Sequence, residues 1–461
     1  MNILTKTAIA TAISATLIGC GGSGSSGGSV TVAETATFKD SVTILGSVKG
    51  TGDQIYKNTP RLAFGDFNGD NFIDIVATFP GTVSANIQVG PNTKAPIKIY
   101  TSDANGTYTD VTNTIFTSSV PATALTRHIS VADFNGDGAD DIFLGNHGIE
   151  ENCGACSDPQ AYWGEEDTLI LSNGAGRLTD STNNITWTTA SNKTSNWDGA
   201  DGHYTHGTYV ADFDGDTDMD ILINVTTAFP QAPLILVNDG AGNFTEHPDA
   251  NMPDYTGSAP LWSTLADVDG DTDLDLIMGG DAVYLNDGTG DFDWAGSKIA
   301  LPANIQNGNV EMILPVDVNG DGNVDLLTQS YSSDPVKYAA GTTQVEVLIG
   351  NGDGTFTDET FARAKNGLDM PISGMFYAVD LNGDGREDIV GVKHTKTVPF
   401  TSTLYVYVNN AGIFEPIDTN YTQSGIAGIG MVDQNNDGDI DLFTGNDGIQ
   451  FFEANKIITI Q

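Results

Sequence analysis

The chain has 461 residues and is strongly acidic, with 61 Asp and Glu residues against 18 Lys and Arg residues and a formal net charge of −43. Such a charge repels nucleic acid and anionic membrane surfaces, so neither is expected as a partner. Hydrophobic residues make up 39% of the chain, which is enough to build a core and excludes a disordered acidic tail. The length allows two or three ordinary domains or one large array of repeats.

The chain opens with a segment typical of secretory leaders. Lys6 is followed by an apolar run from Thr7 to Ile18, which is shorter than the roughly 20 residues that span a bilayer. The run ends in Leu17-Ile18-Gly19-Cys20, which resembles the lipobox of bacterial lipoproteins. This resemblance implies cleavage before Cys20 and acylation of that cysteine. An ordinary signal peptide and a short membrane anchor are the alternatives.

Gly and Ser follow Cys20 almost without interruption, a composition typical of flexible tethers. We therefore expect a signal peptide over residues 1–19, a lipidated tether over residues 20–29 and a folded body over residues 30–461. The protein would then be held on a bacterial outer membrane through its lipid anchor alone, facing either the periplasm or the exterior.

One nine-residue pattern occurs seven times along the folded body. Positions 1, 3, 5 and 9 are always Asp or Asn, and position 4 is Gly in six copies and Asn436 in the seventh. Gly and Asn tolerate positive φ, so the pattern predicts a tight turn at position 4. The oxygen-bearing residues are Asp66, Asn68, Asp70 and Asp74; Asp133, Asn135, Asp137 and Asp141; Asp212, Asp214, Asp216 and Asp220; Asp267, Asp269, Asp271 and Asp275; Asp317, Asn319, Asp321 and Asp325; Asp380, Asn382, Asp384 and Asp388; and Asp433, Asn435, Asp437 and Asp441.

Calcium explains this spacing, because the ion takes six to eight oxygen ligands in a flexible shell. A loop bent around the ion would aim side chains 1, 3 and 5 inward, offer the carbonyl of position 7 and close with the carboxylate of position 9. Without a cation, three or four carboxylates would repel one another at short range. We expect up to seven calcium ions with a mainly architectural role. Solvated Asp-Gly turns are the alternative, and an EF-hand is excluded because position 12 is never acidic.

The sequence around these loops predicts strands. Adjacent apolar residues follow each closing Asp, as in strands buried on both faces. Gly-rich turns at residues 238–244, 286–292 and 351–356 add a second hairpin to each unit. Four antiparallel strands per unit make a propeller blade, so we predict an all-β, seven-bladed propeller. Its acidic loops would join the first and second strands (A and B) of each blade.

These residues resemble the FG-GAP and VCBS repeats of integrin α propellers and of many bacterial surface proteins. The resemblance covers nearly the whole folded body and implies that the acidic loop positions are calcium ligands. The sequence does not decide which segment supplies the strand that closes the ring. The candidates are Thr37-Phe-Lys-Asp40 and Lys456-Ile-Ile-Thr-Ile460.

Ligand-binding residues are expected on the face opposite the acidic loops, where the B–C and D–A connections meet. Two long connections, roughly 147–167 and 182–206, are rich in His and aromatic residues beside acids and amides. Aromatic rings stack on sugar faces while polar groups bond sugar hydroxyls. The alternative is that the rings cap the propeller and the imidazoles satisfy loop backbone groups. The candidate residues are His128, His147, Trp163, Trp187, Trp197, His203, Tyr204 and His206.

The two remaining cysteines, Cys153 and Cys156, lie in one of these connections as Cys-Gly-Ala-Cys. In an oxidising compartment they are expected to form a local disulfide. Free thiols, a redox pair and a metal site are the alternatives.

The leading functional hypothesis is a calcium-stabilised surface binding or adhesion module whose ligand is a polysaccharide or a partner protein. A polysaccharide lyase or hydrolase acting on the face with the histidines is the second hypothesis, and a scaffold subunit of an outer-membrane assembly is the third. The sequence contains no nucleophile elbow, phosphate loop or HExxH zinc motif, which favours binding over catalysis.

Overall fold

The computed structural model describes the strands and many of the loops of the folded body. The described residues are 42–46, 61–79, 94–103, 107–147, 149–150, 162–163, 165–187, 194–195, 201–202, 205–225, 233–247, 262–279, 282–288, 290–292, 296, 298–302, 309–331, 343–365, 370, 372, 376–381, 384–394, 401–417, 422–424, 428–432, 441–446 and 448–452.

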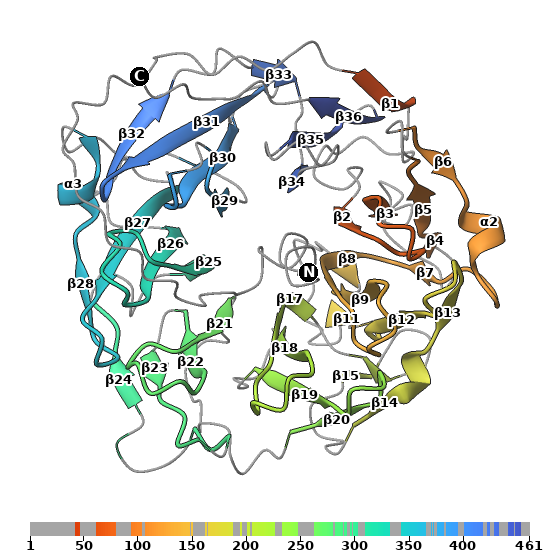
Figure 1. The fold of residues 1–461 in the computed structure, drawn as a ribbon, viewed down its shortest axis with the longest axis horizontal. Coiled ribbons are helices and arrows are strands. Elements are labelled where there is room, and N and C mark those ends of the chain that lie inside the picture. The colour runs from red at the N-terminus through yellow and green to blue at the C-terminus, as the bar shows by residue number, and fades with distance from the viewer. Residues whose placement is uncertain are drawn as a thin grey trace, which may run out of the picture.

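The strands form antiparallel sheets arranged radially around one axis (Figure 1). In six of these sheets, numbered below as blades 1 to 6, the four main strands follow chain order from the innermost, A, to the outermost, D. Blade 1 contains β2 (Arg61–Gly65), β3 (Asp74–Thr78), β5 (Lys98–Thr101) and β6 (Thr109–Asp110). Blade 2 contains β8 (Thr126–Ala132), β9 (Asp141–Asn146), β12 (Thr168–Ser172) and β13 (Leu178–Asp180). Blade 3 contains β17 (Thr205–Ala211), β18 (Asp220–Val225), β19 (Leu234–Asn238) and β20 (Phe244–Glu246).

The next three blades repeat this order. Blade 4 contains β21 (Ser263–Ala266), β22 (Asp275–Met278), β23 (Ala282–Tyr284) and β24 (Lys298–Ala300). Blade 5 contains β25 (Asn309–Val316), β26 (Asp325–Tyr331), β27 (Thr343–Gly350) and β28 (Phe356–Asp358). Blade 6 contains β29 (Phe376–Val379), β30 (Asp388–His394), β31 (Thr401–Asn410) and β32 (Ile413–Ile417).

The prediction of four-stranded antiparallel blades is confirmed for these six blades, in which side chains are described, rather than for seven. A further sheet lies between blades 6 and 1 in Figure 1 and is described by its backbone alone. It contains β34 (Gly428–Val432), β35 (Asp441–Asn446), β36 (Gly448–Phe452) and β1 (Val42–Gly46).

The outer strand of this sheet comes from the N-terminal side of the chain. β1 pairs antiparallel with β36, with Val42 opposite Phe451. Neither segment expected to close the ring, 37–40 or 456–460, lies within the described residues. The pairing strand therefore begins two residues after the N-terminal candidate.

Several shorter elements lie outside the four-strand order of the blades. β14 (Ile185–Thr186) adds a parallel fifth strand to blade 3 outside β20, and β33 (Thr422–Ser424) pairs with β31. The remaining elements are β4 (Ala95–Pro96) with β7 (Ala122–Thr123), β10 (Ile149–Glu150) with β11 (Tyr162–Trp163), β15 (Thr194–Ser195) with β16 (Asp201–Gly202), the short helices α2 (Thr112–Ile115) and α3 (Thr360–Arg363), and the 3-10 turn η2 (Thr182–Asn184).

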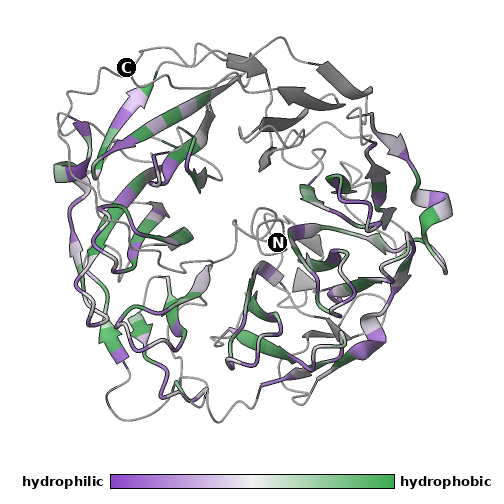
Figure 2. Ribbon diagram, in the orientation of Figure 1, coloured by the Kyte–Doolittle hydropathy of each residue, from purple (hydrophilic) through white to green (hydrophobic). Residues whose placement is uncertain are grey.

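The core lies between the blades, because both faces of each B strand are covered. Phe143 of blade 2, for example, packs in one cluster with Ile221 and Phe244 of blade 3. Figure 2 shows apolar residues concentrated in the strands and hydrophilic ones in the loops. Burying each such large side chain contributes about 1.5–3 kcal/mol, so neighbouring blades stabilise one another. Within the described part of the chain, no helix has the length and apolar character needed to cross a membrane.

Candidate functional site

The acidic loops join strands A and B in each of the six blades, as the sequence predicts. At position 4, Gly69, Gly136, Gly215, Gly270 and Gly320 have φ between 71° and 80°, so the predicted tight turn is confirmed at these five glycines. Position 6 is also left-handed, which the sequence analysis missed. In two loops this position is occupied by β-branched residues, Thr217 (φ 82°) and Thr272 (φ 85°), a conformation that costs them about 1–3 kcal/mol.

The first carboxylate of each loop organises the turn through backbone amides. In blade 4, Asp267 Oδ1 accepts the Gly270 N–H at 2.8 Å and Oδ2 accepts the Thr272 N–H at 3.1 Å. The same pair of bonds recurs in blade 1, where Asp66 accepts the N–H groups of Gly69 and Asn71. These bonds hold the strained position 6 in place and leave further carboxylate lone pairs available for a cation.

The closing carboxylate of each loop is at most 1% exposed in all six blades and fixes the hairpin from inside. In blade 1, Asp74 Oδ2 accepts the Phe67 N–H at 3.1 Å, and Oδ1 accepts the Ser102 N–H at the end of strand C at 2.9 Å. Five other residues make the equivalent two bonds: Asp141, Asp220, Asp275, Asp325 and Asp388. The sequence predicted these residues as metal ligands, and the structure adds this hydrogen-bonding role.

Burial is the main cause that raises the pKa of these closing carboxylates. It raises the pKa of Asp74 to about 8, and nearby Asp70 and Asp66 add to the effect. The pKa rises to about 7 for Asp141, Asp220, Asp275 and Asp388, and to about 6 for Asp325. Each loop therefore places negative charge where solvent stabilises it poorly and where a cation would stabilise it.

In two blades the carboxylates converge closely enough to share one cation. In blade 3, one oxygen each of Asp212, Asp214 and Asp216 lies within 4.8 Å of the others. In blade 4, the same holds for Asp267, Asp269 and Asp275. The donors are all oxygens, which suits a hard cation such as calcium.

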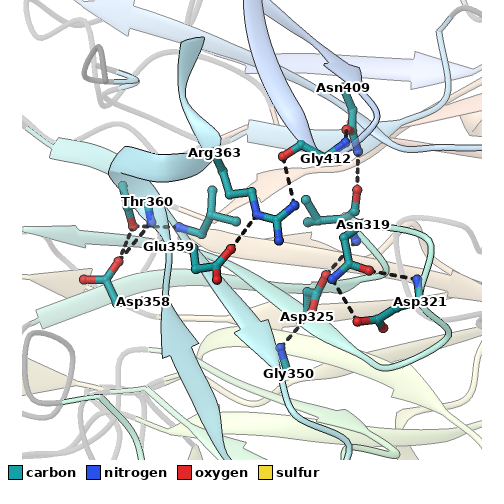
Figure 3. A network of polar contacts seen from close by, with 12 residues as sticks. Asn319, Asp321, Asp325, Gly350, Asp358, Glu359, Thr360, Arg363, Asn409 and Gly412 are labelled. Atoms are coloured by element: carbon teal, nitrogen blue, oxygen red, sulfur yellow. Dashed lines mark hydrogen bonds and ion pairs between the residues drawn. The ribbon is translucent and has the colours of Figure 1, made fainter. Parts of the chain in front are cut away.

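The loops also connect neighbouring blades. Asn238 Nδ2 in blade 3 donates to the Phe134 carbonyl in the blade 2 loop at 2.8 Å, and Asn409 Nδ2 in blade 6 donates to the Val318 carbonyl in the blade 5 loop at 2.8 Å. Figure 3 shows the second of these contacts above Asp325, whose carboxylate accepts the Gly350 N–H. Hydrogen bonds thus link the loop ends of blades 2 and 3 and of blades 5 and 6.

In the same view, Arg363 of α3 links blades 5 and 6 (Figure 3). Its Nε donates to Glu359 at 2.7 Å and its Nη1 donates to the Gly412 carbonyl at 3.4 Å. The side chain of Arg363 therefore contributes to the contact between blades 5 and 6.

At the opposite end of the strands, the structure brings together three of the predicted ligand-binding residues. The His147 and His206 rings are 5.1 Å apart, and Arg127 Nη1 lies 3.0 Å from His147 Nε2. Because guanidinium only donates, Nε2 accepts and the His147 proton lies on Nδ1. His128 Nδ1 lies 2.8 Å from the Thr208 hydroxyl of the next blade.

All three imidazoles are neutral at neutral pH. Burial, with a smaller contribution from the Arg61 charge, lowers the pKa of His128 to about 4. Burial, followed by the Arg127 charge, lowers the pKa of His206 to about 3 and that of His147 well below its usual value. The positive charge at this end of the ring is therefore carried by the arginines.

Among the other predicted ligand residues, Trp187 is the one with a described side chain, and it is not brought into this group. Trp187 follows β14, the outermost strand of blade 3, and packs against the core shared by blades 2 and 3. Four strand spacings, about 19 Å, separate that edge from the innermost strand, which carries His206. Trp163 lies on β11 without a described side chain, and Trp197, His203, Tyr204, Cys20, Cys153 and Cys156 lie outside the described residues.

The sequence analysis missed four residues at this end: Arg61, Arg127, Trp262 and Tyr377. Trp262 Nε1 donates to the Ile313 carbonyl at 3.2 Å, and its ring meets the edge of His128 at 5.5 Å. These residues lie at or next to the starts of A strands, whereas the search for ligand residues concentrated on long connections. An arginine at the start of two successive A strands was the available signal.

Two buried acids near this end are used to position the connection between strands B and C of blade 2. Asp167 accepts the Asn146 N–H at 2.7 Å and the Thr205 hydroxyl at 3.0 Å. Glu165 pairs with Lys94 at 3.0 Å. Their oxygens thus join neighbouring segments.

Comparisons with known proteins agree with this architecture. The FG-GAP-like repeat family matches residues 66–144 and 380–444, which include the acidic loops of blades 1, 2 and 6. No curated protein sequence matches the chain significantly.

Many solved structures are similar to the chain, and two of them illustrate the range. One is an Agrocybe aegerita lectin described as recognising non-reducing terminal N-acetylglucosamine, with 19% identity over 84% of each chain and a TM-score of 0.46. The other is a putative 6-phosphogluconolactonase from Bacteroides uniformis, with 10% identity over 84% of this chain and 96% of that one and a TM-score of 0.41. The repeat matches and the radial blades with their A–B loops together support the FG-GAP repeat family for this chain.

Proposed function

We propose that this protein is a calcium-stabilised binding or adhesion propeller, with a polysaccharide or a surface protein as its ligand. The observation that carries the proposal is the acidic loop itself, which recurs with the same buried closing carboxylate in six blades. A solvated turn does not require a buried acid or a threonine at positive φ, whereas a bound cation would account for both.

The donor set supports calcium in particular. Each loop combines carboxylates at positions 1 and 5, an Asp or Asn oxygen at position 3 and the closing carboxylate, and in blade 4 Asp267, Asp269 and Asp275 converge. A flexible all-oxygen shell suits calcium better than magnesium, which requires stricter octahedral geometry. The ions would neutralise carboxylates along the rim and stabilise the A–B hairpins.

We also propose that the sheet of β34, β35, β36 and β1 is a seventh blade. β34 lies against β2 of blade 1, and Asp441 begins β35 as the other closing residues begin their B strands. Its loop residues Asp433, Asn435 and Asp437 lie outside the described part of the chain. The lipid anchor at Cys20, the outer-membrane location and the Cys153–Cys156 disulfide remain predictions from the sequence.

The end of the strands opposite the acidic loops, which carries His128, His147, His206, Arg61 and Arg127, is called the axial end. The burial and hydrogen bonding of its described groups favour binding over catalysis. The hydroxyl beside His128 belongs to Thr208, which is 1% exposed and also bonded to Ser130 at 2.6 Å. A buried hydroxyl cannot reach a substrate. Arg127 bonded to His147 likewise acts as a positioned cation rather than as a proton carrier.

Calcium removal followed by a binding assay tests the proposal. Each site occupied at 100 times its Kd stabilises the folded state by about 2.7 kcal/mol, so chelation should lower Tm by at least about 10 °C. Millimolar calcium should restore Tm and magnesium should restore it less. A glycan array probed with and without calcium should show calcium-dependent retention. An unchanged melting curve would contradict the stabilising role, and absence of retention together with a co-purifying partner protein would favour the surface-protein ligand.

A further inference from the structure

Two of the five arginines in this acidic chain meet at the axial end of the ring. Arg61 begins β2 of blade 1 and Arg127 lies near the start of β8 of blade 2, two strands that lie against each other. Both side chains are half-buried. Burial is the largest cause that lowers the pKa of Arg61, and the charge of Arg127 is the second. The two cations therefore lie within each other's electric field.

The described groups around these cations are largely neutral or donate hydrogen bonds. His147 and His206 are neutral beside Arg127, and burial raises the pKa of Tyr377, from blade 6, to about 12, so its hydroxyl keeps its proton near Arg61. Asp167, a buried acid of blade 2, accepts bonds from Asn146 and Thr205. Two guanidinium cations therefore lie beside neutral imidazoles and a protonated tyrosine in a chain of net charge −43.

An indole lies at the same end. Trp262 is half-buried, bonded through Nε1 to the Ile313 carbonyl and in edge contact with His128. Gly207 allows this approach, because a Cβ there would lie 2.9 Å from the indole. The ring thus touches groups from blades 2, 3 and 5.

Polar atoms buried next to this indole are a separate sign of a bound polar molecule. Among the described residues, Asn224 Oδ1, Ser263 Oγ and Thr264 Oγ1 are buried and have no hydrogen-bond partner. Asn224 Nδ2 donates to the Ser263 carbonyl at 3.1 Å, which places two of these atoms on neighbouring residues. Buried polar atoms are nearly always hydrogen-bonded, so water or a ligand hydroxyl network is expected here.

We propose that this axial end, around Arg61, Arg127 and Trp262, binds the carboxylate-bearing terminal residue of an acidic saccharide. Guanidinium groups bind carboxylates through paired, charge-assisted hydrogen bonds, and an indole covers the apolar face of a sugar ring. A single terminal residue suits the site, because the charge of the whole chain repels a long anionic polymer. This inference rests on the proposed binding function and assigns its ligand class.

The experiment is calorimetric titration of the full chain in calcium with digalacturonic acid and with its neutral methyl ester. We expect the acid to bind and the ester to bind at least about 10-fold more weakly, since charged hydrogen bonds contribute about 1.5–3 kcal/mol. R61Q should lose about the same factor, R61K should lose less, and W262F should weaken the acid and the ester alike. K365Q, which removes a positive charge paired with Glu415 on the outside of blade 6, should bind like the parent chain.

Equal affinity for acid and ester, or unchanged binding by R61Q, would overturn the assignment. If R61Q does not fold, R61K and the comparison of acid with ester decide the question. Stronger binding of a sulfated disaccharide or of an Asp-Asp dipeptide would show that the ligand class is wrong. Calcium-dependent retention of a neutral glycan without any binding of digalacturonic acid would overturn this inference and leave the proposed function standing.

Discussion

The two ends of the blades differ in how they use charge. At the loop end, six blades repeat one arrangement, in which a buried carboxylate such as Asp275 joins the loop to strand C and acidic side chains surround a turn. At the axial end, each blade contributes something different, such as Arg61 from blade 1, His128 from blade 2 and Trp262 next to blade 4. Repetition at one end and variety at the other are expected if the loop end maintains the architecture and the axial end, as proposed, provides specificity.

This difference also separates two kinds of electrostatic cost. The loop end gathers like charges that a divalent ion can neutralise, so we propose that its stability depends on a bound cation. The axial end keeps its imidazoles uncharged by burial beside arginines, so its stability depends on pH. The following predictions test whether the stability of the loop end responds to calcium and that of the axial end to pH.

The largest effect is expected for Asp275→Ala. This change leaves the N–H groups of Val268 and Asn286 buried without an acceptor, which costs about 1–3 kcal/mol for each group. The loss in free energy of unfolding, measured by urea denaturation, should persist when calcium is chelated, because these bonds need no ion.

Asp271→Ala in the same loop is the matched control. Asp271 is exposed and accepts a single N–H, from Asp273 at 3.0 Å, so its proposed role is that of a calcium ligand. Its effect should be about 2–3 kcal/mol in calcium and close to zero in chelator. If both variants lost the same stability in both conditions, the distinction between hydrogen-bonding and ion-binding carboxylates would be wrong.

The loop end was predictable from the sequence because its chemistry is local. Nine consecutive residues contain the turn and most of its oxygens, so the A–B position of the loops and the positive φ at position 4 could be predicted correctly. Position 6 was missed because Thr217 and Thr272 do not have the usual sequence signal for positive φ. The hydrogen bonds of the closing residues to strand C were also missed, because they depend on pairing with a strand distant in sequence.

The axial end was less predictable because it forms only when the blades assemble. Arg61, Trp262 and Tyr377 are far apart in the chain, and no local pattern relates them. Of the four histidines predicted to gather, His128, His147 and His206 do so, and His203 lies outside the described residues. Trp187 was grouped with them because it shares a long connection, but the extra strand β14 holds that connection at the outer edge of blade 3.

Acid should destabilise the axial end through its histidines. The folded-state pKa of His206, about 3, is below the unfolded value of about 6.5, so the unfolded chain binds the proton first as pH falls. The stabilisation from neutral His206 is complete above pH 6.5 and is lost on acidification toward pH 3. Between pH 6.5 and 5, this one histidine should remove up to about 2 kcal/mol of stability.

His206→Asn measures this contribution directly. Urea denaturation in saturating calcium should show a shallower fall of stability with acid in the variant than in the parent chain. The other titrating groups, such as Asp140, with a pKa raised by burial to about 6, are common to both proteins and cancel in the difference. Parallel pH profiles would show that His206 is exposed to solvent or already charged, and the contrast between the two ends would be lost.

The smallest effect, and the only stabilising one, is expected for Thr272→Gly at position 6 of the blade 4 loop. Thr272 has φ 85° and an exposed side chain, so Gly relieves backbone strain while its N–H still donates to Asp267. Strain relief of about 1–2 kcal/mol, less the greater entropy of Gly in the unfolded chain, leaves a gain of up to about 1 kcal/mol. Thr245→Gly, at an exposed strand position in β20, should instead lose about 1 kcal/mol. A loss at Thr272 in chelator and in calcium alike would mean that its side chain supports the turn, and the loop end would then depend on more than its carboxylates.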